Sequence, residues 1–495
     1  MQGSSRLVDP IPPERRVSTG YSKIQTVLEN HFQAIFDEFV YNRLPRHLLH
    51  VMTRVGNSED VEIEIVSASQ LRSIFEPDLG SILCLDKSQR TSAGEIRARL
   101  GRVLRFAIFS HRWFQEGEPG FHVVDSRRPF TRGYHKLLSF CQRAAQFGCR
   151  LAWSDTCCID KTSSAELDEA IRSMFRWYRF AHVCIVHLSD ATTISFDELE
   201  KDVWFTRGWT LQELLAPKRM KFYGKDWEEL TDMDNDKDHN ALMESVSRIT
   251  TIPISDLRHF QPGTNHIRER MSWASRRTTT RTEDIAYSLI GIFDVNLPIA
   301  YGEGTWAFHR LMEVIIHRCD EWGIFAWAGS PSTHHSRTTA VPQSPACYHL
   351  INVDNFPDES GRVHGDTSFV LSRQGLQLCV MVAIGDMKPK ANALGEEDYE
   401  FTVKPSYAGP TFTPVLVQSS AGIDVERNEW AIGILNYRVV EPEGEYGKIE
   451  GGQSYVCYLL RRFEDTWVRE PTDNILIVDT LFESESREQV RKLWL

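Results

Sequence analysis

The chain has 495 residues and a mass of 56.9 kDa, which at about 100–200 residues per domain corresponds to roughly two to four domains. Hydrophobic residues make up 41% and charged residues 25% of the sequence, the composition of an ordinary globular protein. With 56 Lys and Arg against 68 Asp and Glu, the formal net charge is −12. This balance argues against a protein that binds nucleic-acid backbones, although it is compatible with a small basic pocket for a nucleotide.

The sequence contains no sign of a membrane or secretory segment. No apolar run approaches the roughly 20 residues needed to cross a bilayer, and the N-terminal run MQGSSRLVDPIPPERR lacks the apolar core of a secretory signal. We therefore expect no membrane span and a cytoplasmic location. Ten cysteines in a chain of this length do not form a disulfide framework, so we expect free thiols.

The first hundred residues predict a tail followed by a small α+β lead-in. Residues 1–20 are polar, hold three prolines and show no periodicity, as a flexible tail would. Between residues 24 and 39, large apolar side chains recur at helical spacing. Residues 61–66 alternate charged and β-branched side chains, which is typical of a half-buried strand. We assign residues 21–100 to the lead-in.

The central part of the chain alternates strand and helix patterns. Apolar runs predict strands at 105–110, 150–158, 182–188 and 220–223, and helical patterns lie between them at 134–147, 163–180 and 209–215. The second of these helices has a serine and Glu166 spaced for a capping box. Strands separated by helices predict right-handed crossovers and a parallel sheet with helices on both faces.

The remaining sequence predicts a helical extension and a second, β-rich domain. Residues 241–328 are mainly helical in pattern, which extends the α/β domain over 101–328. A stretch rich in Gly, Pro, Ser, Thr and His, 329–345, predicts a linker. Within 346–495 short strands are expected, separated by turns, at 369–371, 376–382, 415–417, 431–435, 455–460 and 475–478. Such a series predicts an antiparallel sandwich or barrel.

Polar side chains follow the first strand of the predicted parallel sheet. Ser110, His111 and Arg112 stand at its carboxyl end, which is where open parallel sheets bind ligands. A hydroxyl, an imidazole and a guanidinium together can hold a phosphate or a ribose. The competing interpretation is a loop with a buried Trp113 and solvated polar neighbours.

The second strand is followed by another polar group. Asp155, Asp160 and Lys161 come within seven residues of one another after it. The two carboxylates can orient a polar ligand. Asp160 and Lys161 equally suit a surface ion pair, so both interpretations stay open.

Two adjacent cysteines, Cys157 and Cys158, lie inside that same segment. Neighbours on a strand point to opposite faces, and no CxxC or paired-histidine spacing accompanies them, so we expect no metal site. Buried thiols are the first interpretation. A nucleophilic thiol paired with His111 is the second, and it requires a lowered thiol pKa.

Trp209 and Glu213 lie four residues apart in the third helical pattern and so share one helix face. An aromatic ring beside a carboxylate suits a ribosyl-nicotinamide group, because the ring stacks on the base and the carboxylate stabilises a cation-like transition state. An amphipathic helix with a buried Trp and a solvated Glu is the competing interpretation. Further on, the arginine-rich segment 276–284 either grips phosphates or forms an internal network, and 302–304 is a two-glycine turn without a dinucleotide fingerprint.

Three long segments of the chain resemble the fungal heterokaryon-incompatibility (HET) domain. They are GYHKLLSFCQRAAQFGCRLAWSDTCCIDKTSSAELDEAIRSMFRWYRFAHVCIVHLSD, WFTRGWTLQELLAPKRMKFYGKDW and MSWASRRTTTRTEDIAYSLIGIFDVNLPIAYGEG. The resemblance spans about 100–328. HET domains trigger cell death when incompatible fungal cells fuse, and the family is distantly similar to TIR domains, which have a flavodoxin-like fold. Ser154 and Phe114 depart from many relatives, which have Ile and Gly at these positions.

The resemblance implies an activity and roles for residues. Several TIR domains cleave NAD+ to nicotinamide and an ADP-ribose product when they oligomerise, using a helix with a Trp and, four residues on, a catalytic Glu. Here W-T-L-Q-E-L places Trp209 and Glu213 in those roles. The implied substrate-binding residues are Trp209, Ser110, His111, Arg112, Asp155, Asp160 and Lys161.

These considerations predict a TIR-like cell-death effector that hydrolyses NAD+ and forms a homo-oligomer on activation. NAD+ would be its substrate, so no cofactor or metal is expected. The alternative is a non-catalytic signalling module that acts through oligomerisation and partner binding, and a thiol hydrolase is a third, distant possibility. The β-rich C-terminal domain is expected to be a module for recognition of a protein partner, for regulation or for oligomerisation.

Overall fold

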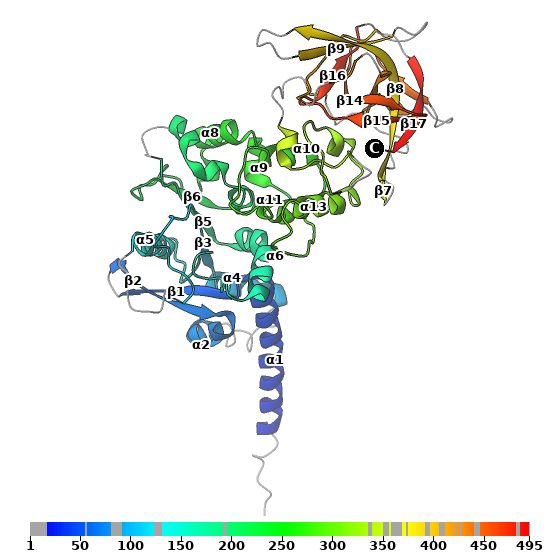
Figure 1. Cartoon of the computed structure of the whole chain (residues 1–495). Helices are drawn as coiled ribbons and strands as arrows, with labels where there is room; N and C mark the ends of the chain where they lie inside the picture. The colour runs from blue at the N-terminus through cyan, green and yellow to red at the C-terminus, as the bar shows by residue number, and fades with distance from the viewer. Residues whose placement is uncertain are drawn as a thin grey trace, which may run out of the picture. The chain divides into compact units, whose positions relative to one another are not determined.

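Figure 1 shows the computed structural model of the chain. The chain forms two compact units. One comprises residues 1–193 and 217–239, and the other comprises residues 194–216 and 240–495. The structure describes residues 17–54, 57–80, 92–122, 131–191, 196–334, 339–349, 356–357, 369–372, 375–391, 397–404, 411–420, 423–425, 428–439, 446–481 and 486–494. The tail expected over 1–20 therefore lies outside the described residues except for 17–20, which begin the first helix.

A six-stranded mixed sheet forms the first unit, in the order β2-β1-β4-β3-β5-β6. Its strands are β1 (His47–Arg54), β2 (Asn57–Ser67), β3 (Phe106–His111), β4 (Leu151–Trp153), β5 (Val183–His187) and β6 (Met220–Tyr223). Strands β4, β3, β5 and β6 are parallel, which confirms the parallel sheet expected from their spacing.

The lead-in belongs to the same sheet. Its β1–β2 hairpin is antiparallel, and β1 pairs with β4 through Leu49 opposite Ala152 and His50 opposite Leu151. The sheet is therefore mixed, whereas the sequence pattern predicted only its parallel part. Without β1, the outer edge of β4 would have unpaired backbone N–H and C=O groups, and β1 pairs with this edge.

The helices of the first unit are α1 (Val17–Arg43), α2 (Leu71–Ile74), α4 (Ala93–Val103), α5 (Arg132–Gln146) and α6 (Ser164–Phe180), with short 3-10 turns η1 (Ala68–Gln70) and η4 (Asp236–Asp238). Phe140 of α5 stacks on Phe109 of β3 with ring centroids 4.4 Å apart. On α6, Tyr178 packs edge-on against Trp153, which is in register with Ile108. Because Ile108 and Phe109 point to opposite faces, α5 and α6 cover opposite faces of the sheet.

The start of α6 follows the predicted capping pattern only in part. Ser163 Oγ accepts from Glu166 N at 3.4 Å, as an N-cap should. The Glu166 carboxylate, however, accepts from Asp160 N at 3.0 Å and lies 2.9 Å from His47 Nδ1. The capping box is therefore incomplete. The Glu166 carboxylate bonds to His47 of β1 and to a loop N–H in place of the backbone N–H of Ser163.

The turn after α5 depends on a glycine, and we expect Gly148→Ala to destabilise the protein by about 1–3 kcal/mol. Gly148 has φ +66, and a Cβ there would lie 2.3 Å from Nη2 of Arg105. Gly94 in α4 is the matched control, because its Cβ would meet nothing closer than 3.8 Å, and helix propensity predicts that Gly94→Ala stabilises. Urea unfolding of both variants measures the difference, and equal effects would contradict the backbone argument.

Short helices make up the first part of the second unit. They are η2 (Phe196–Lys201), η3 (Val203–Thr206), α7 (Thr210–Leu215), α8 (Asn240–Thr250), α9 (Ile254–His259), α10 (Ile267–Ala274), α11 (Asp284–Tyr287), α12 (Ile290–Phe293), α13 (Trp306–Ile316), η5 (Trp322–Phe325) and η6 (Pro345–Tyr348). This agrees with the helical pattern expected beyond residue 241. The α7 helix lies in the connection from β5 to β6 yet packs as part of the second unit.

The second unit continues into an antiparallel sheet of eleven strands, as the C-terminal pattern predicted. They are β7 (Val370–Ser372), β8 (Gly375–Ala391), β9 (Glu397–Val403), β10 (Val415–Val417), β11 (Trp430–Ile434), β12 (Arg438–Val439), β13 (Tyr446–Ile449), β14 (Ser454–Phe463), β15 (Thr466–Glu470), β16 (Leu476–Asp479) and β17 (Ser486–Trp494). The long strands β8 and β14 each pair with several partners along their length. Their inner faces enclose one apolar core.

The stretch that the sequence predicted as a linker is folded where it is described. Pro331 and Pro342 form an antiparallel bridge, and Ser332 N donates to Val341 O at 2.8 Å. The buried guanidinium of Arg469 donates to Thr339 O at 3.1 Å. The described residues on the two sides of this stretch therefore pair with each other and bond to Arg469 of β15. The division into the five segments expected from sequence (1–20, 21–100, 101–328, 329–345 and 346–495) stays a prediction.

No helix among the described residues is both long and apolar enough to cross a membrane.

Candidate functional site

The carboxyl end of β3 carries two of the predicted site residues on opposite faces of the sheet. His111 stacks on Phe109, on the face that α5 covers, with ring centroids 4.0 Å apart. Ser110 lies on the other face and is fully buried. The hydroxyl and the imidazole are therefore separated by the strand itself.

His111 lies in a dry environment. It is opposite His187 of β5 in the parallel register, and its Nε2 is 3.5 Å from Oδ1 of Asp155. Desolvation, followed by the charge of Lys136, lowers the pKa of His111. Desolvation likewise lowers the pKa of His187 to about 4, so both imidazoles are neutral at pH 7.

Asp155 is the centre of a small polar group at this edge. It accepts from Nε1 of Trp113 at 3.0 and 3.2 Å, and Nζ of Lys161 lies 3.9 Å from the centroid of the Trp113 ring. Burial works to raise the pKa of Asp155, but the His111 contact, the Lys161 charge and the Trp113 bond together lower it. The structure thus brings His111, Asp155 and Lys161 together, with Trp113 as the link.

Arg112 and Asp160 have other partners. Nη1 of Arg112 lies 3.2 Å from Oδ2 of Asp190 in an exposed ion pair. Oδ1 of Asp160 accepts from the Thr162 hydroxyl at 2.6 Å and lies 3.7 Å from Nε2 of His122. The side chains of these two predicted residues therefore pair with Asp190, Thr162 and His122 and not with His111 or Asp155.

Lys136 of α5 belongs to the group but was missed by sequence reasoning. Its Nζ lies 2.5 Å from Oε1 of Glu118, donates to Arg112 O at 2.9 Å and is 3.9 Å from the centroid of the Phe114 ring. Lys136 falls in the apolar stripe of α5, next to Leu137. A lysine in a buried stripe was the signal that the sequence offered.

The adjacent cysteines have the character of structural thiols. The neighbouring Cys158, followed by burial, raises the pKa of Cys157 well above its usual value. A raised thiol pKa disfavours the thiolate that a nucleophile needs. Within the described part of the chain, no group of three or more His, Cys, Asp or Glu side chains gathers to hold a metal ion.

The Trp209–Glu213 pair lies in the second unit. Trp209 is the N-cap of α7, and Glu213 N donates to Trp209 O at 3.4 Å. The pair therefore shares a turn, as the spacing predicted. Trp209 is half-buried, while Glu213 is only 7% exposed, so the carboxylate is not a solvated surface group.

Arg277 fixes the beginning of α7. Its Nη1 donates to Arg207 O and to Oγ1 of Thr210, both at 2.9 Å. Desolvation lowers the pKa of Arg277 to about 9, and the negative charge of Glu213 acts in the opposite direction. Of the two interpretations of the 276–284 segment, the buried internal network fits Arg277.

The Trp209 indole donates a hydrogen bond to Asp284 of α11. The Tyr301 hydroxyl also donates to Oδ1 of Asp284, at 2.8 Å, and the Arg281 guanidinium lies 4.4 Å from the centroid of the Tyr301 ring. Burial raises the pKa of Asp284 despite these donors. The half-buried indole is therefore held in one orientation.

The two-glycine turn is attached to the same place. Oε1 of Glu283 accepts from Gly302 N at 2.8 Å and Gly304 N at 3.0 Å. Both glycines have positive φ, +101 and +59, which explains why glycine stands there. The turn is therefore anchored on Glu283, the residue that precedes Asp284, the partner of Trp209.

The comparisons agree with the motifs. The family described as Heterokaryon incompatibility protein (HET) matches residues 106–200, from β3 to η2. A curated relative, the Vegetative incompatibility protein HET-E-1 of Podospora anserina, is 41% identical over 243 residues, which is 46% of this chain and 18% of the relative. The chain thus matches less than a fifth of the length of that relative. No solved structure gives a significant match.

The family match covers β3, which carries Ser110 and His111, and the loop after β4, which carries Asp155, and it confirms the resemblance to the HET domain over these residues. This chain therefore contains a heterokaryon incompatibility (HET) domain, matched over residues 106–200.

Proposed function

We propose that the chain is an effector of fungal heterokaryon incompatibility and cell death, and that its HET domain hydrolyses NAD+. The first part is supported by the HET match and by the 41% identity to a vegetative incompatibility protein. The proposal includes a homo-oligomer as the active state and a cytoplasmic location.

The topology of the first unit supports the proposed likeness to TIR domains. Its parallel strands lie in the order β4-β3-β5-β6, which is 2-1-3-4 in chain order among themselves. This is the order of flavodoxin-like, doubly wound sheets, in which ligands bind beyond the carboxyl ends of the strands at the point where the order reverses. Here that point is between β3 and β5.

The observation that carries the enzymatic part of the proposal is the fixed indole and buried carboxylate of α7. Trp209 is held by Asp284, and Glu213 lies near the buried cation of Arg277. Opposite charges stabilise each other in a dry environment. A carboxylate in such a place is suited to stabilise a developing ribosyl cation.

In the proposed reaction the bond between ribose C1′ and the nicotinamide nitrogen breaks, and its electron pair stays on nicotinamide. Glu213 stabilises the resulting cation, and Trp209 stacks on a base of NAD+. Water adds to C1′ and releases a proton, which yields ADP-ribose. Ser110, His111, Arg112, Asp155, Asp160 and Lys161 are the proposed substrate-binding residues, and NAD+ is a substrate, with no separate cofactor.

The test is nicotinamide release by the purified full chain from NAD+, measured at low and high protein concentration and with a crowding agent that forces assembly. Glu213→Gln keeps the shape of the side chain and removes its charge, and we expect it to lower the rate at least about 100-fold. Glu244→Gln on α8 is the matched control, because Glu244 is exposed. Wild-type activity in Glu213→Gln would show that the assigned carboxylate is wrong.

One observation favours a non-catalytic signalling module as the second candidate. Every residue of α7 is buried, including Glu213, so the helix can be a structural part of a signalling module as well as part of an active site. If no nicotinamide is released under any of these conditions, while incompatible cell death survives Glu213→Gln, the signalling module is the better assignment. A protein partner of the β-rich region fits either candidate.

A further inference from the structure

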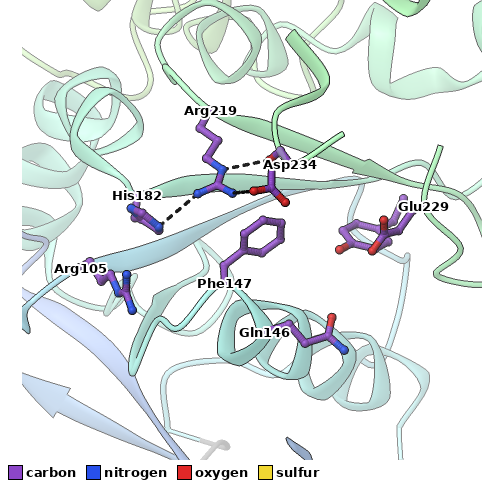
Figure 2. A pocket seen from close by; sticks show the side chains of 8 residues that line it. Arg105, Gln146, Phe147, His182, Arg219, Glu229 and Asp234 are labelled. Atoms are coloured by element: carbon purple, nitrogen blue, oxygen red, sulfur yellow. Dashed lines mark hydrogen bonds and ion pairs between the residues drawn. The ribbon is translucent and has the colours of Figure 1, made fainter. Parts of the chain in front are cut away.

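A pocket lies at the opposite edge of the sheet of the first unit, where the parallel strands begin (Figure 2). Its volume is about 430 Å³. The residues that line it are Arg105, Gln146, Phe147, His182, Arg219, Tyr223, Glu229 and Asp234. None of them was a candidate in the sequence, and none belongs to the site at the carboxyl edge.

Three neighbouring strands each contribute to the pocket the residue that precedes them. Arg105 precedes β3, His182 precedes β5 and Arg219 precedes β6. The parallel register aligns them, because His182 N donates to Phe106 O and Cys184 N donates to Arg219 O, both at 2.9 Å. Two guanidiniums and an imidazole are therefore placed side by side by the sheet itself, and not by a mobile loop.

The donors of these side chains are only partly used. Arg105 donates from Nε to Gly148 O at 2.7 Å, which uses one of the five N–H groups of a guanidinium. Nη1 of Arg219 lies 3.4 Å from Nε2 of His182. Desolvation, and then the charges of Arg105 and Arg219, lower the pKa of His182. A neutral His182 that accepts from Arg219 through Nε2 carries its proton on Nδ1, where it is a donor.

The other wall of the pocket has acceptors. Arg219 donates from Nε to Asp234 O at 2.9 Å, and its Nη2 lies 3.2 Å from Oδ2 of Asp234. Oε2 of Glu229 lies 3.1 Å from Nζ of Lys221. Carboxylates beside these basic side chains disfavour a ligand with many negative charges. They can accept hydrogen bonds from the hydroxyl groups of a ligand. The Phe147 ring, 4.8 Å from the Arg219 guanidinium carbon, adds an apolar surface between the walls.

We propose that this amino-edge pocket binds a small phosphomonoester that also carries hydroxyl groups, with the phosphate on Arg105, His182 and Arg219 and the hydroxyls on Asp234 and Glu229. Guanidinium groups match the geometry of phosphate oxygens, and the volume is within the range of small-molecule sites. Sugar phosphates and nucleoside monophosphates share this chemistry. The pocket shares no residue with the site proposed for NAD+ hydrolysis, and this proposal does not depend on that activity.

The test is calorimetric titration of the full chain with ribose 5-phosphate, adenosine monophosphate and inorganic phosphate. We expect saturable binding of ribose 5-phosphate, weakened at least about tenfold by Arg105→Gln, because a charge-assisted hydrogen bond is lost. Arg102→Gln, on the exposed side of α4, removes the same charge and should change nothing. Tighter binding of adenosine monophosphate identifies a nucleotide as the ligand, and tighter binding of ribose 5-phosphate identifies a sugar phosphate.

Asp234→Asn provides a second test that does not endanger the fold, because the Asp234 side chain is 93% exposed. This change ends the ion pair with Nη2 of Arg219 and replaces a charged acceptor of hydroxyl groups with a weaker, neutral one, while the bond from Nε of Arg219 to Asp234 O remains. Inorganic phosphate should then bind more tightly, and the preference for ribose 5-phosphate over inorganic phosphate should fall. Absence of saturable binding with all three probes would overturn the proposal, as would equal weakening by Arg105→Gln and Arg102→Gln or an unchanged preference in Asp234→Asn.

Discussion

Arg277→Met is expected to lower the free energy of unfolding by about 3–5 kcal/mol, the cost of removing one partner from a buried charged network. Arg277 is fully buried beside Glu213, and it donates to Arg207 O, Thr210 Oγ1 and Trp273 O. Methionine fills much of the same space but leaves these acceptors and the Glu213 carboxylate without the guanidinium. Any activity that depends on the position of α7 should be lost with it.

Arg276, the residue before Arg277, provides a matched control for this prediction. Arg276 is exposed, and its Nε donates to Nδ1 of His349 at 3.4 Å. Arg276→Met should therefore change the free energy of unfolding by less than about 1 kcal/mol. Arg277→Lys should also destabilise, because an ammonium cannot reproduce the fork that spans Arg207 and Thr210. Urea unfolding of the three variants measures these free energies. Equal losses of stability in Arg277→Met and Arg276→Met would refute the role of burial.

Acidification from pH 7 to pH 4 is expected to destabilise the first unit by about 3 kcal/mol through His187 alone. Its pKa in the folded chain is about 4, against 6.5 for a histidine exposed to water, and desolvation is the main cause. The folded state then binds fewer protons than the unfolded state. The stabilisation is complete above pH 6.5 and is lost as the pH falls towards 4. His111, whose pKa is also lowered, acts in the same direction.

Unfolding in urea at pH 7 and pH 4.5 measures this effect. His187→Gln should flatten the dependence on pH, whereas His135→Gln should leave it as in the wild type, because His135 is exposed on α5. A slope that is unchanged in His187→Gln would show that other groups cause the acid sensitivity.

Local patterns in the sequence predicted the secondary structure well, because each depends on residues near in the chain. The strands around Ile108, Ile185 and Phe222 and the helices α5 and α6 lie within a few residues of their expected bounds. The second strand is shorter than its pattern, since Cys157 N and Cys158 N both donate to Ser154 O and so turn the chain after Trp153. Pairing of β1 with β4 was not predictable, since it depends on backbone groups far apart in sequence.

The candidate site was harder to predict, because a site depends on which face a side chain takes and on distant partners. Adjacent residues such as Ser110 and His111 were grouped by sequence but are divided by the strand. The Trp209–Glu213 spacing was visible, whereas the contributions of Arg277 and Asp284 required the packed second unit. The roles in NAD+ hydrolysis come from the resemblance and stay proposals.

The path of the chain between β5 and β6 has a consequence for synthesis on the ribosome. The chain leaves the first unit after residue 193, gives residues 194–216 to the second unit, and returns at 217. The α7 helix is therefore made long before Arg277 and Asp284, which hold it. A fragment that ends with the family match at residue 200, or with the last strand of the first sheet, contains an incomplete second unit. The HET segment at 106–200 therefore lacks β6 of the first unit and α7 of the second unit. Neither unit is complete in it.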